Sequence, residues 1–320
     1  MQRRTVLALS TAVPFAIAGG AWATVNANAA TDTSDSSIAS YPTTIALPDG
    51  FAPEGIAISG QYAFLGSRAT GSVYKASLAT GTGSVIYTGP GTPSNGIKID
   101  SRGRAFIAGN VGGDIRVISI KTGELLASYQ VTAPGASFLN DVILTSSGAW
   151  VTDSYNATLY KVPISSSGAL PTSVDGVVTL PLTGITITPA TVNLNGITTT
   201  PDGKSLLVVQ SNTGLLFKVN PSTGAATQVD LGGASVINGD GLLRDDCELF
   251  VVQNRSNAMS VFTLNEAGTT GTLSTTITND AFAIPTTVAS FGNRLYIVNG
   301  KLTTAITATE PYNFIAIPKP

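Results

Sequence analysis

The stretch NLNGITTTPDGKSLLVVQ, from Asn193 to Gln210, has the pattern of a β-hairpin that begins at a polar residue. Two runs rich in β-branched and large apolar residues, GITTTP and SLLVVQ, flank the turn PDGK. Pro, Asp and Gly are typical of tight turns because they supply a fixed φ, a side-chain cap and a left-handed backbone. The stretch therefore predicts two antiparallel strands, and it places the polar amide of Asn195 just before the first of them.

The same pattern recurs along the chain at a nearly constant interval. The matched residues stand at positions 54, 95, 140, 195, 240 and 285, so the intervals are 41, 45, 55, 45 and 45 residues. A repeat of about 45 residues that contains about four short strands is typical of a β-propeller blade. The six segments contain the sequences PEGIA, SNGIK, LNDVI, LNGIT, GDGLL and IPTTV.

We therefore predict an all-β fold, a six-bladed β-propeller with four antiparallel strands per blade, over residues 41–320. The last unit contains only three strand-like runs, TTVASF, RLYIVN and YNFIAIP. We expect the N-terminal segment TTIALP, residues 43–48, to supply the fourth strand in the blade of Tyr296 and Phe314. This closure would pair the two ends of the domain and leave no open sheet edge.

The segment before the repeats has the features of an export signal. Residues 1–29 contain the cationic start MQRR, an apolar run and the A-x-A sequence ANA, which predict a cleaved signal peptide. Arg3 and Arg4 are also compatible with twin-arginine export. Residues 30–40 are predicted to be a flexible leader. We therefore expect a secreted or extracytoplasmic protein with no membrane contact after signal removal.

Composition excludes several functional classes. Charged residues make up 11% of the chain, the formal net charge is −2, and no basic cluster is present, so a nucleic-acid partner is not expected. The chain has no His and a single Cys, Cys247. This excludes Ser-His-Asp and Cys-His catalysis as well as His-based zinc, copper or iron sites. Any bound metal must therefore be held by oxygen atoms.

The residues at the matched positions are mostly such oxygen donors. In a propeller the first strand of each blade lies along the central channel, so the residue before it lies at one mouth. Carboxylates and amides suit Ca²⁺, with Mg²⁺ or Mn²⁺ as alternatives, and two buried carboxylates would repel each other without a cation. Asn and Asp at such junctions also cap turns, so a purely structural role stays open. The matched residues are Glu54, Asn95, Asn140, Asn195, Asp240 and Pro285, and the predicted ligands are Glu54, Asn140, Asn195 and Asp240.

The loops between the second and third strands of each blade are expected to emerge on the same face. They provide candidates for binding a small-molecule substrate around the metal. Asp153 is the candidate for an additional catalytic carboxylate, although it could equally cap a turn. The residues expected to line this pocket are Arg68, Asn95, Asn110, Phe138, Asp153, Tyr155, Gln210, Asn254, Arg255 and Asn299.

The motifs PEGIA, LNDV, LNGI and GDGL resemble the senescence-marker-protein/gluconolactonase-like (luciferin-regenerating-enzyme-like) family of six-bladed propellers and the related calcium-dependent phosphotriesterases. The resemblance implies that Glu54, Asn195 and Asp240 hold a divalent cation, usually Ca²⁺. It also implies that Asn140 ligates the cation or lies beside the substrate. Gluconolactonase-type members carry an arginine where this chain has Phe138, which favours an apolar over a sugar-like substrate.

These features together predict a secreted, divalent-metal-dependent hydrolase of a lactone, an ester or a phosphotriester. The cation would polarise the carbonyl or phosphoryl oxygen, and a metal-bound water, or a carboxylate such as Asp240 or Asp153, would attack or act as base. The alternative is a non-catalytic or biosynthetic ligand-binding propeller, in which the metal is structural or orients a reactive intermediate.

Overall fold

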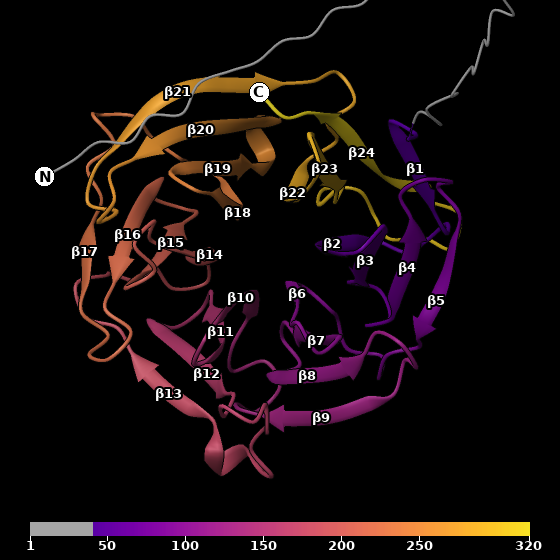
Figure 1. Ribbon diagram of the computed structural model, residues 1–320, viewed down its shortest axis with the longest axis horizontal. Helices are drawn as coiled ribbons and strands as arrows, with labels where there is room; N and C mark the ends of the chain where they lie inside the picture. Colours follow the sequence, from indigo (N-terminus) through magenta and orange to yellow (C-terminus); the bar gives the residue numbers. More distant parts are fainter. Residues whose placement is uncertain (1–40) are drawn as a thin grey trace, which may run out of the picture. The chain divides into compact units, whose positions relative to one another are not determined.

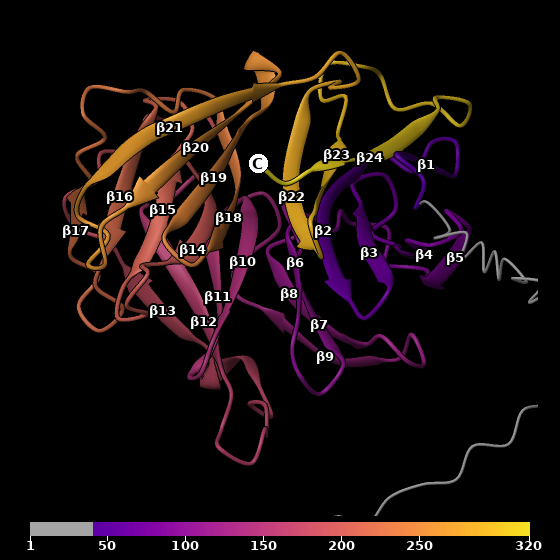
Figure 2. The same ribbon diagram turned by 45° about the horizontal axis from the view of Figure 1, so that its top comes forward.

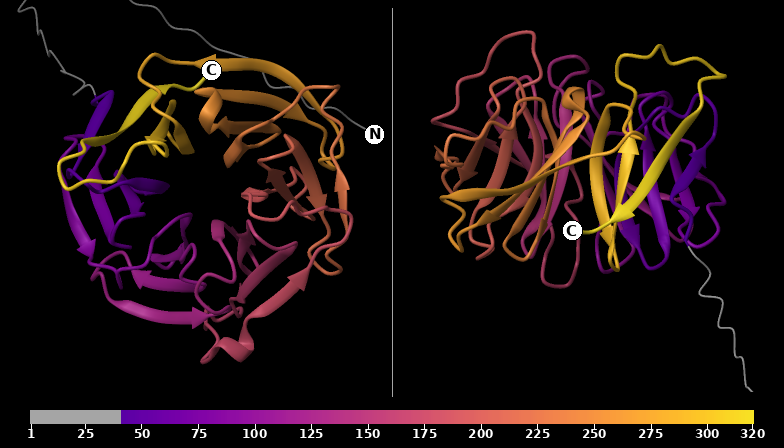
Figure 3. Two further views of the ribbon diagram at one scale, coloured as in Figure 1. Left: turned by 180° about the vertical axis from the view of Figure 1, so that it is seen from behind. Right: turned by 90° about the horizontal axis from the view of Figure 1, so that it is seen from above.

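The computed structural model describes residues 41–320, and these form six four-stranded antiparallel sheets arranged in a ring (Figure 1). The predicted signal peptide and leader lie outside the described residues. Views from behind and from above show the sheets surrounding one axis (Figure 3). Residues 41–320 contain no helix long and apolar enough to cross a membrane. Their only helical elements are the 3-10 turns η1 (Val174–Gly176) and η2 (Asn254–Ser256). The prediction of a six-bladed propeller is confirmed.

The first three blades follow one another along the chain, each running outward from its innermost strand. Their strands are β2 (Pro53–Ser59), β3 (Tyr62–Ser67), β4 (Val73–Ser77) and β5 (Gly83–Tyr87); β6 (Ile97–Ile99), β7 (Arg104–Ala108), β8 (Asp114–Ser119) and β9 (Leu125–Gln130); β10 (Leu139–Thr145), β11 (Gly148–Asp153), β12 (Thr158–Pro163) and β13 (Val178–Pro181).

Blades 4 to 6 continue the same order, and the innermost strands of all blades stand beside the axis (Figure 2). Their strands are β14 (Leu194–Thr199), β15 (Leu206–Gln210), β16 (Leu215–Val219) and β17 (Ala226–Gln228); β18 (Gly239–Asp245), β19 (Glu248–Gln253), β20 (Ala258–Leu264) and β21 (Gly271–Thr278); β22 (Pro285–Phe291), β23 (Arg294–Asn299), β24 (Tyr312–Pro318) and β1 (Thr44–Leu47).

The hairpin of β14 and β15 has the local chemistry that its sequence predicts. Asp202 Oδ1 accepts hydrogen bonds from the Lys204 backbone N–H at 3.0 Å and from the Thr200 hydroxyl at 2.6 Å. Gly203 adopts φ +67°, the left-handed conformation that turns require and that L side chains avoid. The turn therefore sets the register in which Ile197 pairs with Val208, and both side chains are fully buried.

The ring is closed by the N-terminal strand, as predicted. Strand β1 pairs antiparallel with β24, with Thr44 opposite Ile315 and Leu47 opposite Tyr312. Ile45 and Leu47 are buried while the residues between and before them are exposed, which is the alternation of an outer strand. The closure gives the edge of β24 a hydrogen-bonded partner and joins the two ends of the domain.

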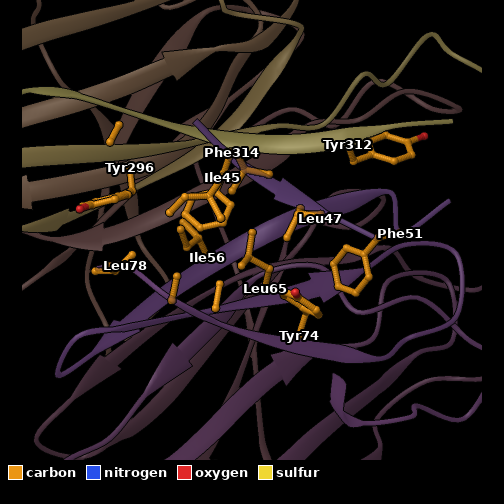
Figure 4. Close-up of a cluster of buried hydrophobic side chains, with 14 of the residues drawn as sticks. Ile45, Leu47, Phe51, Ile56, Leu65, Tyr74, Leu78, Tyr296, Tyr312 and Phe314 are labelled. Carbon is orange, nitrogen blue, oxygen red and sulfur yellow. The ribbon is translucent and has the colours of Figure 1, made fainter. Parts of the chain in front are cut away.

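The core lies between neighbouring blades. In the cluster between blades 6 and 1, Ile45 and Phe314 pack against Ile56 and Leu65 (Figure 4). Deleting such a side chain to Ala typically costs about 2–5 kcal/mol in the free energy of unfolding. Similar clusters join every other pair of neighbouring blades, so the innermost strands that carry the candidate site are held by apolar contacts on both sides.

Candidate functional site

A repeated β-bulge positions the polar residues at the mouth of the channel. In five innermost strands the pairing register shifts at the same place, for example between Pro53 and Ile56 in β2 and between Leu194 and Ile197 in β14. A bulge inserts an unpaired residue and re-aims its side chain. The bulge residues, with Asn95 of blade 2, form what we call the mouth ring: Glu54, Asn95, Asn140, Asn195, Asp240 and Thr286.

Blade 6 corrects the predicted alignment by one residue. The register shift in β22 lies between Pro285 and Val288, so Pro285 corresponds to Pro53 and Thr286 corresponds to Glu54. The Thr286 hydroxyl donates a hydrogen bond to the Glu54 backbone carbonyl at 2.7 Å. It therefore ties blade 6 to blade 1, whereas a proline would leave that carbonyl without this partner.

The residue after each member of the mouth ring is usually glycine, and the packing shows why. A Cβ added at Gly55 would lie 2.3 Å from the Asn95 carbonyl oxygen, and one added at Gly196 would lie 2.2 Å from the Asp240 carbonyl oxygen. Each innermost strand thus passes against the backbone of the next blade. This close approach brings the members of the mouth ring together around one axis.

Blade 3 departs from the glycine rule, and the departure adds a carboxylate that the sequence analysis missed. Asp141 follows Asn140 where blades 1, 2, 4 and 5 have glycine, and its side chain is buried. Its carboxylate accepts backbone hydrogen bonds from Val142 at 2.8 Å and from Ile197 of the next blade at 3.2 Å. Burial raises the pKa of Asp141, although Lys98 and these hydrogen bonds oppose the rise. Its replacement of a repeated glycine was the available signal.

The two carboxylates of the mouth ring are electrostatically unsatisfied. Burial raises the pKa of Glu54 well above its usual value, the negative charges of Asp240 and Asp141 raise it further, and Arg68 and Lys98 oppose the rise. Burial likewise raises the pKa of Asp240 to about 7, against the hydrogen bond that its Oδ2 accepts from Asn254 Nδ2 at 2.7 Å. Both side chains would ionise more readily beside a cation.

The amides of blades 2 and 3 are hydrogen-bonded to one another. Asn95 Oδ1 accepts from Asn110 Nδ2 at 2.8 Å, and Asn95 Nδ2 donates to Asn140 Oδ1 at 3.4 Å. Asn140 Nδ2 donates to the hydroxyl of Ser154 at 2.9 Å. Asn95 therefore has hydrogen-bond partners for both its oxygen and its nitrogen. Asn140 Oδ1 accepts only the long hydrogen bond from Asn95.

Asn195 differs from these amides. Its Oδ1 is buried and has no hydrogen-bond partner among the described residues. A buried polar oxygen without a donor is unfavourable by about 1–3 kcal/mol unless another ligand satisfies it. The donor set of Glu54, Asn195 and Asp240, with Asn140 beside it, therefore fits a hard cation that takes oxygen ligands. Within residues 41–320 no three acidic or cysteine side chains converge as a metal site, so amide oxygens would have to complete the coordination.

A cavity of about 430 Å³ opens above the mouth ring. Nine residues predicted for the site line it: Glu54, Arg68, Asn95, Asn110, Phe138, Asn140, Asn195, Asp240 and Asn254. Arg255, which the sequence also placed here, lines it as well. The lining that the sequence analysis did not include consists of Thr191, Val192, Ser211, Asn212, Asn238 and Leu302.

Asp153, Gln210 and Asn299 are not among the cavity-lining residues, and one structural role explains all three. Each ends the second strand of its blade and holds the loop that enters its own innermost strand. Asp153 Oδ1 accepts from the backbone N–H of Phe138 at 3.1 Å, Gln210 Nε2 donates to the Thr186 carbonyl at 2.7 Å, and Asn299 Oδ1 accepts from Ala283 N–H at 2.9 Å.

In several blades the residue that lines the cavity is the one directly after the last residue of the second strand. Ser211 follows Gln210 and lines the cavity, just as Arg68 follows the last residue of β3. A shift of one residue moves a side chain to the other face, so the prediction at position 210 was displaced by one. Tyr155 does not line the cavity, but its ring packs edge-on against Phe138 with centroids 5.6 Å apart.

Asn193 holds the loop that brings Thr191 and Val192 to the cavity. Its Nδ2 donates to the carbonyls of Thr188 and Thr191, each at 3.0 Å, and its Oδ1 accepts from the Thr188 backbone N–H at 2.8 Å. Asn193 is fully buried. This loop therefore forms one wall of the cavity through a single amide that mimics backbone pairing.

Comparison with known proteins identifies the fold but no family. No protein-family model matches the sequence, and no curated protein matches it significantly. Among solved structures, regucalcin, a calcium-binding protein from Agrobacterium tumefaciens, is 18% identical over 88% of this chain and 96% of its own, with a TM-score of 0.60.

Two further structures share the fold. A luciferin-regenerating enzyme is 12% identical over 85% of this chain and 95% of its own, with a TM-score of 0.58. A catalytically inactive histidine-to-alanine variant of virginiamycin B lyase from Staphylococcus aureus is 17% identical over 80% of both chains, with a TM-score of 0.56. At these identities the likeness to the senescence-marker-protein/gluconolactonase-like family is one of fold.

Proposed function

We propose that the cavity binds one divalent cation, Ca²⁺, through Glu54, Asn195 and Asp240, with Asn140 as a further oxygen donor. The observation that carries the proposal is the convergence of two buried, mutually repelling carboxylates and one buried amide oxygen without a partner. Ca²⁺ suits this set better than Mg²⁺ because it accepts neutral amide oxygens and irregular geometry, whereas Mg²⁺ requires a near-ideal octahedron. Mn²⁺ is the remaining alternative.

We further propose that the protein hydrolyses a lactone, an ester or a phosphotriester outside the cytoplasm. A divalent cation at this site supplies Lewis-acid polarisation of a carbonyl or phosphoryl oxygen. Asn254 Nδ2 holds Asp240 Oδ2 and so orients the carboxylate at the floor of the cavity. In the metal-free protein burial raises the pKa of Asp240 to about 7, so cation binding near neutral pH would displace a proton and leave an ionised carboxylate that can ligate the cation or accept a proton from water.

A lyase of the kind seen among the structural neighbours is a weaker proposal for this chain. The lyase variant in that comparison is inactive after loss of one histidine, and this chain has no histidine. Asp153 is also not proposed as a catalytic group, because its carboxylate is hydrogen-bonded to the loop and does not line the cavity.

One observation favours the alternative of a non-catalytic or biosynthetic ligand-binding propeller. Glu54 and Asp240 are the only acidic residues that line the cavity among the described residues. If both ligate the cation, the cavity retains no separate carboxylate to act as a base. In that case the cation and the pocket would hold a ligand without hydrolysing it.

The test combines metal content with turnover. Purified protein is assayed for bound metal and then for hydrolysis of aryl esters, lactones and phosphotriesters, with Ca²⁺ and with chelator. The hydrolase proposal expects one Ca²⁺ per chain and activity that disappears with chelator and returns with Ca²⁺. Stoichiometric Ca²⁺ without turnover of any substrate class would support the binding alternative, and absence of bound metal would contradict both.

A further inference from the structure

Two arginines line the cavity from neighbouring parts of the ring. Arg68 follows β3 in blade 1, and Arg255 lies in η2 of blade 5, with blade 6 between them. Arg68 is held in place because its Nη2 donates to the Gly300 carbonyl at 2.6 Å and its Nε donates to the Pro53 carbonyl at 3.5 Å. Neither guanidinium forms an ion pair with a carboxylate of residues 41–320.

Two apolar side chains, Phe138 and Val192, line the cavity among polar residues of blades 3 and 4. Phe138 leads into blade 3 and Val192 leads into blade 4, which lie opposite blades 6 and 1 in a ring of six. Tyr155 supports Phe138 by edge-on packing with an interplanar angle of 83°. The cavity thus offers two guanidinium groups from blades 1 and 5 and two apolar side chains from blades 3 and 4, with the mouth ring as its floor.

The charges that face the cavity leave the arginines in excess once a cation is present. Glu54 and Asp240 are the acidic lining residues, and Arg68 and Arg255 are the basic ones. A divalent cation would neutralise the two carboxylates and leave two guanidinium groups without counter-charges. Arg68, which lies close enough to Glu54 to oppose its pKa rise, would then no longer be needed as the counter-charge of that carboxylate.

We propose that the cavity recognises an organic anion, namely a carboxylate attached to a flat apolar group. Arg68 and Arg255 bind the carboxylate oxygens, and Phe138 and Val192 contact the apolar part. Guanidinium groups match the fork of a carboxylate and bind it by charge-assisted hydrogen bonds. This inference deepens the proposed function, because its charge balance rests on the proposed cation and it assigns a substrate class to the same site.

Arg255 provides the cleaner variant. Its side chain is exposed and makes no hydrogen bond within the described residues, so Arg255→Gln should leave folding unchanged. Arg68 is less suitable because its guanidinium also donates a hydrogen bond to the Gly300 backbone carbonyl. The matched control is Arg102→Gln, because Arg102 is also exposed but lies outside this cavity. The probes are benzoate and its neutral isostere benzamide, whose binding is measured by calorimetry in saturating Ca²⁺ at low salt.

We expect benzoate to bind the wild type at least about tenfold more tightly than benzamide, since charge-assisted hydrogen bonds exceed neutral ones by this order. Arg255→Gln should remove most of that preference without changing benzamide binding, and Arg102→Gln should preserve it. Added salt should weaken benzoate alone.

The same titrations separate this inference from the proposed function. Stoichiometric Ca²⁺ with equal binding of benzoate and benzamide overturns the anion site and leaves the cation proposal standing. Equal losses in Arg255→Gln and Arg102→Gln overturn it as well. Benzoate binding that depends on Arg255 in a protein that takes up no Ca²⁺ supports the anion site and contradicts the proposed function.

Discussion

Two parts of the mouth ring share a backbone position but differ in their chemistry. In blades 2 and 3, the amides of Asn95 and Asn140 bond to each other and to neighbouring side chains. In blades 1, 4 and 5, Glu54 and Asp240 are carboxylates disfavoured by burial, and the Asn195 oxygen has no donor. The polar groups that lack a partner, rather than polarity at the channel mouth as such, are therefore the ones to which we assign the proposed cation.

The largest effect on Ca²⁺ affinity should come from removing the charge of Asp240, one of the two buried carboxylates of the mouth ring. Asp240→Asn keeps the shape of the side chain and one oxygen, so we expect Ca²⁺ affinity to fall about a hundredfold or more, because one of two anionic ligands is lost. The wild type at a Ca²⁺ concentration of a hundred times Kd should gain about 2.7 kcal/mol of stability, seen as a rise in Tm.

The control is Asp202→Asn, since Asp202 caps a turn far along the β14–β15 hairpin and should leave Ca²⁺ binding unchanged. A Ca²⁺-dependent rise in Tm that survives in Asp240→Asn would contradict the assignment of Asp240 as a ligand.

The next largest effect should come from pH, because it changes the charge of the buried carboxylate of Asp240. In the metal-free protein the Asp240 pKa of about 7 lies above its unfolded value, so the folded state binds more protons between about pH 4 and 7. The stability of the chelated protein should therefore fall as pH rises through this window. Ca²⁺ affinity should rise over the same window, by up to about tenfold per pH unit for each proton displaced.

Calorimetry in buffers of different ionisation enthalpy should then report proton release when Ca²⁺ binds at pH 6. An affinity that stays constant from pH 5 to 8 would show that Glu54 and Asp240 are already ionised in the metal-free protein, and the distinction between the two parts would lose its electrostatic basis.

An alanine substitution in each part of the mouth ring should have opposite effects on stability and on Ca²⁺ affinity. Asn95→Ala should cost about 1–3 kcal/mol of unfolding free energy, because it leaves Asn110 and Asn140 without their partner, while Ca²⁺ affinity should change less than about threefold. Asn195→Ala should have the opposite result, a small change in chelated stability and a loss of about tenfold in Ca²⁺ affinity. Denaturant unfolding and Ca²⁺ titration of both variants provide the measurement. If the two variants behaved alike, the mouth ring would act as one network.

The fold was predictable because the same strand pattern occurs in six segments of the sequence. The last segment lacks one strand, which indicated that Thr44–Leu47 completes that blade. The channel-mouth positions were predictable where glycine follows the polar residue, since the pair signals a bulge against a neighbouring backbone. Blade 6 has two threonines there, and without the glycine the alignment moved by one residue to Pro285.

Other parts of the site depended on contacts that local sequence does not contain. At the positions of Asp153 and Gln210 the sequence is equally compatible with a side chain that holds a loop and with one that lines the cavity. The strand register decides between these two orientations. Thr191 and Val192 reach the cavity because Asn193 holds their loop by hydrogen bonds across the blade. Only the assembled ring brings Asp141 close enough to affect Glu54 and Asp240.

The smallest expected effect concerns Thr286, the member of the mouth ring in blade 6. Thr286→Val preserves shape and removes only the hydroxyl, which is fully buried and committed to the Glu54 carbonyl. We expect a loss of about 1 kcal/mol in the free energy of unfolding. Ca²⁺ affinity should change less than about threefold, because the Glu54 backbone is also held by pairing within blade 1 and the hydroxyl itself is not available as a ligand. Ca²⁺ titration and denaturant unfolding measure both quantities in the same preparations. A loss of more than tenfold in Ca²⁺ affinity at near-native stability would instead show that Thr286 contributes to Ca²⁺ binding. Blade 6 would then belong with blades 1, 4 and 5 rather than with the structural amides of blades 2 and 3.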